Sequence, residues 1–359
     1  MVSLPPILRQ NPYQRLLYEH LEPHGVRYVG SGELKLGWLV RRRSNVAVLH
    51  FHWPENYYYW LGRPVRARVP LSWLRVLLFA VRLAVARLLG YRIVWTVHQV
   101  RPHESLGRRL DLTATWLLAH SSAAILAHDE STALQVERDA RLPRGRVDVV
   151  PHGSYVGVYP PGRDRRTVRR ELGIPDDAVL LLSFGHLRGY KEATALVEAF
   201  GALEDPVVHL LVAGLPLDAS AREDVARAAT ADPRIRVVLE FVPDEQVSEL
   251  FGACDLCVFA RRDGGTSGAL VLALSLGVPV VAADVPAYRE LLGDERAGWL
   301  FDPRAADGLE ASLRRATGDR EVIATKAKAA SAVADDLAWP VLAPRYAAVI
   351  GDVGELAAR

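Results

Sequence analysis

Short apolar runs alternate with longer amphipathic stretches along most of the chain. The apolar runs are closed by glycine or polar residues, which is typical of buried parallel strands, and the stretches between them have helical periodicity. This alternation predicts an α/β fold built from doubly wound, Rossmann-like sheets. We expect strands at 2–8, 25–30, 45–51, 93–97, 178–184, 207–213, 235–239, 257–260 and 278–284, a strand with its loop at 123–129 and a strand with its turn at 298–303. We expect helices at 14–21, 71–89, 110–119, 131–139, 192–200, 244–253, 269–277 and 305–316, and one that ends at 172.

A proline pair and a glycine interrupt the pattern in the segment Tyr159–Asp164. Such residues mark linkers, and a chain of 359 residues is long enough for two domains with separate cores. We therefore expect an N-terminal domain over 1–158 and a C-terminal domain over 163–336.

The segment Cys257–Asp284 reads as a strand, a glycine-rich loop, an apolar helix and a second strand. The loop then lies at the carboxyl end of a strand, where open α/β sheets bind ligands. Thr266, Ser267 and Gly268 are expected at the start of the helix, and the free N–H groups there suit a phosphate. The alternative is a tight turn with a Thr/Ser cap.

An aromatic loop follows the strand expected at 45–51. It includes His52, Trp53 and Glu55, and aromatic faces with polar edges stack well on sugars or bases. We expect these residues to bind a ligand of that kind. The alternative is a Tyr/Trp cluster that closes a domain edge.

A second polar group follows the strand at 93–97. His98, His103 and Glu104 supply two imidazoles and a carboxylate at a strand end, which is what acid–base chemistry needs. As a metal site they have no clear geometry, so we expect no metal there.

Charge divides unevenly between the two halves. Residues 1–160 hold 21 Lys and Arg against 11 Asp and Glu, whereas the whole chain has a net charge of +2. The helix expected at 71–89 carries Arg75 and Arg82 on one face and no acidic residue. Such a helix suits an anionic membrane surface; the alternative is a core helix whose arginines reach water. Its arginines argue against a helix that spans the membrane.

Cys254 and Cys257 are the two cysteines, in a C-x-x-C spacing. No further ligands follow at zinc-site spacing, and both lie in apolar surroundings, so we expect buried free thiols.

The first residues show no charged leader followed by an apolar core, so no signal peptide is expected.

The segment TSGALVLALSLGVPVVAADV resembles the donor site of nucleotide-sugar glycosyltransferases with the GT-B fold, the glycosyl transferases group 1 superfamily. Retaining members carry an E-x7-E pair here, and those positions hold Gly264 and Leu272 in this chain. The loop that starts at Gly185 resembles the superfamily's first C-domain turn. By that match Arg188 and Lys191 bind the donor diphosphate, and two cations beside a glycine loop stabilise a leaving phosphate without a metal.

The segments HFHWPE, WTVHQVRPHE and VVPHGSY resemble the acceptor domain of bacterial exopolysaccharide-type GT-B enzymes, which include β-mannosyltransferases. This resemblance implies that His52, Trp53 and Glu55 bind the acceptor. Residues 337–359 resemble the superfamily's last helix, which packs back on the first domain. The resemblance implies two Rossmann-like domains that face each other across a cleft.

The resemblance implies a metal-independent glycosyltransferase that moves a sugar from a nucleotide-diphosphate donor to an acceptor hydroxyl. The loss of the E-x7-E pair favours inversion, for which Glu104 is our first candidate base, ahead of His98, His103 and Asp129. The acceptor would be a saccharide, a lipid-linked or a small molecule, with no nucleic acid partner and no cofactor. We expect a cytoplasmic protein, peripheral at the inner membrane face. The alternative is a non-catalytic sugar-binding or regulatory protein on the same scaffold.

Overall fold

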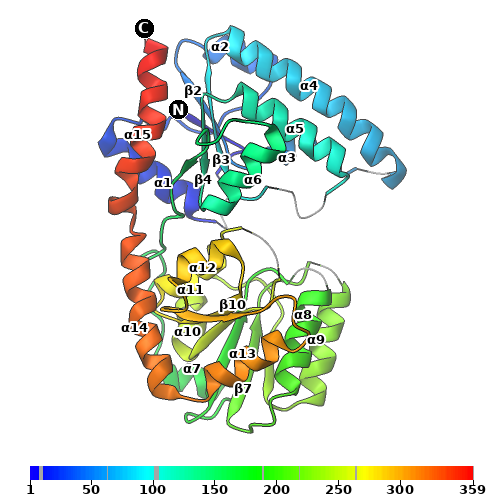
Figure 1. Ribbon diagram of the computed structural model, residues 1–359, viewed down its shortest axis with the longest axis vertical. Helices are drawn as coiled ribbons and strands as arrows, with labels where there is room; N and C mark the ends of the chain where they lie inside the picture. Colours follow the sequence, from blue (N-terminus) through cyan, green and yellow to red (C-terminus); the bar gives the residue numbers. More distant parts are fainter. Residues whose placement is uncertain are drawn as a thin grey trace. The chain divides into compact units, whose positions relative to one another are not determined.

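A computed structural model describes the chain except residues 8–10, 63, 101–104, 188–189, 218, 263–264 and 359, and describes only the backbone at 190–193 and 352–358. The chain forms two compact units. The first comprises residues 1–153 and 339–359, and the second comprises residues 154–338. Each unit contains its own parallel sheet (Figure 1). His103, Glu104 and Arg188, together with the side chain of Lys191, lie outside the described residues.

The sheet of the first unit has five parallel strands in the order β1-β2-β3-β4-β5. Alternate strand residues such as Leu49, Phe51 and Ile93 pack under α4, α5 and α6, while α1 and α15 cover the other face. The strands are β1 (Val2–Leu4), β2 (Val48–Phe51), β3 (Arg92–Val97), β4 (Ala124–Ala127) and β5 (Asp148–Val149). The helices are α1 (Tyr13–Leu21), η1 (Glu22–His24), α2 (Leu36–Arg42), α3 (Glu55–Tyr58), η2 (Val65–Ala67), α4 (Arg68–Leu88), α5 (Arg108–Ser121), α6 (Glu130–Ala140) and α15 (Trp339–Ala358).

The C-terminal helix α15 is built into the first unit through α1. The hydroxyls of Tyr13 and Tyr346 lie 3.3 Å apart, and both side chains are fully buried. Trp339 at the start of α15 fills the space beside Gly153, where an added Cβ would lie 2.4 Å from the indole ring. The fold of the first unit therefore requires residues from both ends of the chain.

The prediction of a strand at 25–30 is wrong. This segment is extended, and Val29 and Gly32 donate backbone hydrogen bonds to Met1 and Ser3, but it forms only an isolated bridge to β1 through Ser31. The strand β1 also ends at Leu4 rather than continuing to residue 8 as expected, and its ladder is formed with β2.

The sheet of the second unit has six parallel strands in the order β11-β10-β9-β6-β7-β8, the order of a dinucleotide-binding Rossmann sheet. Buried residues alternate to both faces, as at Leu180 and Leu181, so helices must cover both sides. The strands are β6 (Val179–Phe184), β7 (Val208–Ala213), β8 (Ile235–Val238), β9 (Leu256–Phe259), β10 (Val280–Ala283) and β11 (Gly298–Phe301). The helices are α7 (Arg165–Glu171), α8 (Tyr190–Gly201), α9 (Ala219–Ala231), α10 (Asp244–Ala253), α11 (Gly268–Ser275), α12 (Pro286–Leu292), α13 (Gly308–Thr317) and α14 (Arg320–Asp336).

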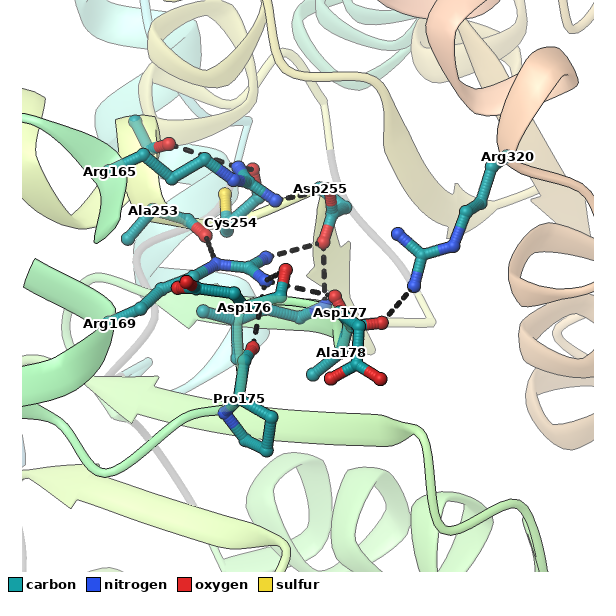
Figure 2. A network of polar contacts seen from close by, with 12 residues as sticks. Arg165, Arg169, Pro175, Asp176, Asp177, Ala178, Ala253, Cys254, Asp255 and Arg320 are labelled. Carbon is teal, nitrogen blue, oxygen red and sulfur yellow. Dashed lines mark hydrogen bonds and ion pairs between the residues drawn. The ribbon is translucent and has the colours of Figure 1, made fainter.

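A buried arginine joins α7 to the amino end of this sheet. The Arg169 side chain is 1% exposed; its guanidinium donates to the Asp255 carboxylate at 2.7 Å and to the carbonyls of Ala253, Pro175 and Ala178 (Figure 2). The second Asp255 oxygen receives Arg165 at 2.5 Å. Because each nitrogen of the Arg169 guanidinium has an acceptor, the buried charge is tolerated, and removal of Asp255 would cost about 3–5 kcal/mol.

Cys254 and Cys257 are free and buried, as expected. Burial raises the pKa of both thiols, so neither forms a thiolate at neutral pH. The C-x-x-C pair therefore offers no thiolate for redox chemistry.

Candidate functional site

The carboxyl edge of the second unit's sheet contains the donor-site segments expected from the sequence. The chain leaves β6 towards β7 on one side, and β9 lies on the other side of β6. The strand order reverses between β6 and β9, and ligands of open α/β sheets bind outside the strand ends at such a point. Gly185 follows β6 directly, and Thr266, Ser267 and Gly268 lead from β9 into α11.

The start of α11 is formed by the residues that the sequence indicated. Ser267 is the N-cap, and its hydroxyl accepts a hydrogen bond from the Leu270 amide at 3.4 Å. Gly268 is the first helical residue. Leu272, at one position of the missing carboxylate pair, is buried in a helix without charge, so this part of α11 supplies no acid–base group.

Two glycines bring the loops after β6 and β7 close together. Gly214 has φ of +144°, and a Cβ added to it would lie 1.8 Å from the carbonyl oxygen of Gly185. Leu187 then donates to the Leu215 carbonyl at 3.1 Å, which holds the two loops side by side. Only glycine fits at position 214, because a side chain there would collide with the loop that contains Gly185.

The sequence interpretation overlooked one further cation at this edge. Arg261 is half-buried directly after β9, two residues beyond Phe259. The signal was available as the Arg-Arg pair that follows the apolar run ending at Ala260. A guanidinium at a strand end beside a helix start is suited to a phosphate.

Five histidines gather at the carboxyl edge of the first unit's sheet. They come from four successive strands or the residues just after them, which is why residues far apart in sequence become neighbours. Four of them, with Tyr18 and Thr96, form one continuous chain of hydrogen bonds. The contacts are Thr96–His50 at 2.8 Å, His50–Tyr18 at 3.1 Å, Tyr18–His52 at 2.8 Å, His52–His98 at 3.0 Å and His98–His128 at 3.3 Å.

The direction of this histidine chain is fixed at one end. Nδ1 of His128 lies 3.2 Å from the carbonyl oxygen of Val150, which can only accept, so Nδ1 carries the proton. Nε2 of His128 is then an acceptor and receives Nδ1–H of His98. In turn Nε2 of His98 receives Nδ1–H of His52. Each ring is neutral and carries its proton on Nδ1.

The same direction continues to the other end of the chain. The Tyr18 hydroxyl donates to Nε2 of His52 and accepts Nδ1–H of His50, whose Nε2 accepts the Thr96 hydroxyl. Every ring nitrogen of His50, His52 and His98 therefore has a partner. A proton added to Nε2 of His98 would place its N–H against Nδ1–H of His52, so two donors would lie face to face.

Burial lowers the pKa of all five histidines. It lowers the pKa of His50 to about 3, of His152 to about 3 and of His128 to about 4. The pKa values of His52 and His98 fall well below the usual 6.5, because of burial first and neighbouring imidazoles second. The cluster is uncharged at neutral pH.

The expected acceptor residues lie next to this chain. The Trp53 ring stacks on His98 at 4.5 Å between centroids, and Glu55 lines a small pocket with His52 and Gln99. Nε2 of Gln99 donates to Glu55 at 3.3 Å, and burial raises the pKa of this carboxyl. His52, Trp53 and Glu55 are thus brought together.

The structure constrains the choice of a base. Both ring nitrogens of His98 are engaged in the chain, so His98 has no free lone pair for an acceptor proton. Asp129 is the N-cap of α6, and its carboxylate receives the Thr132 amide at 2.8 Å and the Ser131 hydroxyl at 2.6 Å. Glu104, our first candidate, lies outside the described residues. Among the described residues, no group of His, Cys, Asp and Glu has the arrangement of a metal site.

Comparison with known proteins agrees with the fold. Residues 164–332 match the model of the family described as glycosyl transferases group 1. The GDP-mannose:glycolipid 4-beta-D-mannosyltransferase of Xanthomonas campestris pv. campestris is 28% identical over 300 residues, which cover 82% of this chain and 76% of that protein. The D-inositol 3-phosphate glycosyltransferase of Corynebacterium glutamicum is 24% identical over 351 residues, 95% of this chain and 80% of the relative.

A solved structure extends the likeness to the whole fold. HepE of Anabaena, in complex with UDP and glucose, superposes with a TM-score of 0.73 at 16% identity, and the match covers 98% of this chain and 99% of HepE. Residues 164–332 belong to the glycosyl transferases group 1 family, and the chain is a glycosyltransferase with the GT-B fold.

Proposed function

We propose that this protein transfers a hexosyl group from a nucleoside diphosphate sugar to a hydroxyl of a lipid-linked saccharide, in the synthesis of a glycoconjugate. The observation that carries the proposal is the reversal of strand order between β6 and β9, because the chain after β9 enters α11 at Gly268 and a helix start offers backbone N–H groups to a diphosphate. The glycolipid in the name of the Xanthomonas relative supports a lipid-linked acceptor.

The transfer proceeds with inversion at the anomeric carbon. The acceptor oxygen forms a bond to that carbon while the bond to the diphosphate oxygen breaks, and the hydroxyl proton passes to a carboxylate of the first unit. Glu104 is our candidate for that carboxylate. The support is the apolar Leu272 on α11 and the engaged ring of His98, which leave neither a donor-side carboxylate nor a free imidazole at these positions.

The departing diphosphate is stabilised without a metal ion. Arg188 and Lys191 supply positive charge, and the amides at the start of α11 supply hydrogen bonds. The sequence has no Asp-x-Asp element, the usual way to hold a divalent ion on a diphosphate. Nucleic acid is not a substrate, and no cofactor takes part.

The test combines donor identity with product stereochemistry. The protein is incubated with UDP-, GDP- and dTDP-sugars and a lipid-linked saccharide, and the anomer of the product is read from NMR coupling constants. We expect release of one nucleoside diphosphate and a product inverted relative to the donor. A product with retained configuration would overturn the inverting mechanism, and binding of nucleotide sugars without any transfer would favour a regulatory protein instead.

The base is tested with Glu104→Gln, with Glu19→Gln on the surface of α1 as the matched control. The first variant should bind nucleotide sugar normally and lose roughly 10²–10⁴ in turnover, the range for one general base. The control should keep full activity because Glu19 pairs only with Arg15 at the surface. Normal turnover by Glu104→Gln would remove this residue from the mechanism.

A further inference from the structure

Helix α4 has two apolar sides, and the core uses only one of them. Its buried residues Ser72, Val76, Phe79, Leu83 and Ala86 recur at helical spacing, and the last four belong to the hydrophobic core of the first unit. This stripe attaches α4 to its own unit.

The opposite side of α4 is apolar and exposed to solvent. Leu74, Leu77 and Val81 are 52%, 61% and 45% exposed, and Leu88 is 86% exposed. With about 100° of rotation per residue these four side chains lie about opposite the buried stripe. Trp73 is also exposed at the margin. Contiguous exposed apolar surface of this kind marks an interaction site.

Neighbouring elements extend this outer face. Helix α2 packs against α4 and exposes Leu36 and Val40, and α5 packs along α4 and exposes Trp116 (Figure 1). Tryptophans with one apolar and one polar edge are favoured where an apolar phase meets water. Exposed apolar side chains therefore occur on helices that pack against α4 as well as on α4 itself.

The charges around this face have one sign. Residues 57–103 contain eight arginines and no aspartate or glutamate. Arg66 and Arg87 are exposed near the two ends of α4, and Arg41, Arg42 and Arg43 are exposed at the end of α2. An apolar surface with a cationic margin is complementary to a bilayer that contains anionic lipids.

We propose that the outer face of α4, together with α2 and Trp116, docks the protein on an anionic lipid bilayer. The helix lies in the plane of the interface. By length and composition Val65–Leu88 is long and apolar enough to cross a membrane, and it is the one such helix among the described residues. However, Phe79 and Leu83 are fixed in the core of the first unit, so the helix cannot leave it to span.

A second copy of the chain is a poorer occupant of this face. Two copies would bring arginine margins together without acidic residues to pair with them, because none occurs in 57–103. Anionic headgroups supply the missing negative charge, and acyl chains cover Leu74 and Leu77.

The test is co-sedimentation of the full chain with vesicles of phosphatidylcholine containing 30% phosphatidylglycerol, in low and in high salt. We expect binding at low salt that weakens several-fold in high salt. Leu74→Glu/Leu77→Glu should lower partitioning at least about tenfold, because two leucines lose their apolar contact. Val341→Glu is the control, since Val341 is 56% exposed on α15, outside this face.

Each outcome decides the proposal. Circular dichroism and thermal unfolding confirm that the variants are folded, and binding of UDP and GDP to the second unit should be unchanged in both. A double variant that sediments as the parent does, or a parent that does not bind anionic vesicles, overturns the proposal. A parent that forms dimers which the double variant dissociates, without vesicle binding, assigns the face to a second copy instead.

Discussion

The five clustered histidines of the first unit should make this protein sensitive to mild acid. Their rings are neutral in the folded state, whereas the unfolded chain exposes the same imidazoles to water. Unfolded histidine has a pKa near 6.5, and burial lowers the pKa of His50, His128 and His152 to about 3, 4 and 3. The unfolded state therefore binds more protons than the folded state below pH 6.5.

The sign and size of the effect follow from linkage. A lowered folded-state pKa gives stability that is complete above pH 6.5 and is lost as the pH falls towards the folded-state values. Each histidine contributes a slope of about 1.4 kcal/mol per pH unit in that window and a loss of about 2 kcal/mol at pH 5. The three histidines together lose about 6 kcal/mol, which is comparable with the whole stability of a typical domain. Asp129 beside His128 opposes this loss slightly, because it favours the charged imidazole.

Tryptophan fluorescence can isolate the first unit in this measurement. Seven of the eight tryptophans belong to it, and Trp299 belongs to the second unit. In a Trp299→Phe background, urea unfolding followed by fluorescence at several pH values between 7.5 and 5 gives the free energy of unfolding of the first unit. The slope against pH counts the protons taken up on unfolding.

Two variants separate the histidine chain from general acid effects. His128→Gln should lower the free energy of unfolding at pH 7.5, because the Val150 carbonyl loses its hydrogen bond from His128. It should also make the slope against pH shallower by about 1.4 kcal/mol per pH unit, because one histidine is removed. His120→Gln, on the exposed end of α5, should change neither quantity. A free energy of unfolding that is constant from pH 7.5 to 5.5 would refute the tautomer assignment and the burial argument together.

Three further predictions concern the second unit. Arg188→Ala and Lys191→Ala should each weaken nucleotide binding by about 1.5–3 kcal/mol, the value of a charged hydrogen bond, and unchanged affinity in calorimetry would contradict the diphosphate contact. EDTA should leave turnover unchanged, and activity that depends on added magnesium or manganese would contradict metal independence. Gly214→Ala should destabilise the second unit by on the order of 2–4 kcal/mol in urea unfolding, because the new Cβ would collide with the Gly185 carbonyl. Gly252→Ala in α10, where a Cβ meets no other atom, should stabilise the unit by about 0.5–1 kcal/mol.

The sequence predicted the second unit well because its signals are local. Apolar runs closed by glycine identified β6, β9 and β10, and the small-residue helix that ends before Gly277 identified α11. Thr266, Ser267 and Gly268 then follow from strand and helix order alone. The order of strands and helices does not predict side-chain contacts. The ion pairs of Asp255 with Arg165 and Arg169 depend on tertiary packing, so the sequence did not predict them.

The first unit was predicted less completely, for a physical reason. In the sequence each histidine of the cluster is simply a polar residue near a strand end; the five are His50, His52, His98, His128 and His152. They become neighbours because the strand order β2-β3-β4-β5 places consecutive strand ends side by side. No periodicity in the sequence encodes that order.

The histidine chain also decides which chemistry the acceptor side can supply, and this gives a kinetic test. If the base is a carboxylate such as Glu104, with an ordinary pKa near 4.3, kcat/KM should be nearly flat between pH 7.5 and pH 6. A free imidazole with a pKa of 6.5 would instead lose about fourfold over the same interval. His98 cannot take that role while its ring nitrogens hold His52 and His128. The interval lies above the pH at which the first unit should unfold, so activity and stability can be measured on the same samples. A fourfold fall between pH 7.5 and pH 6 that persists in Glu104→Gln would show that an imidazole outside the hydrogen-bonded chain is the base.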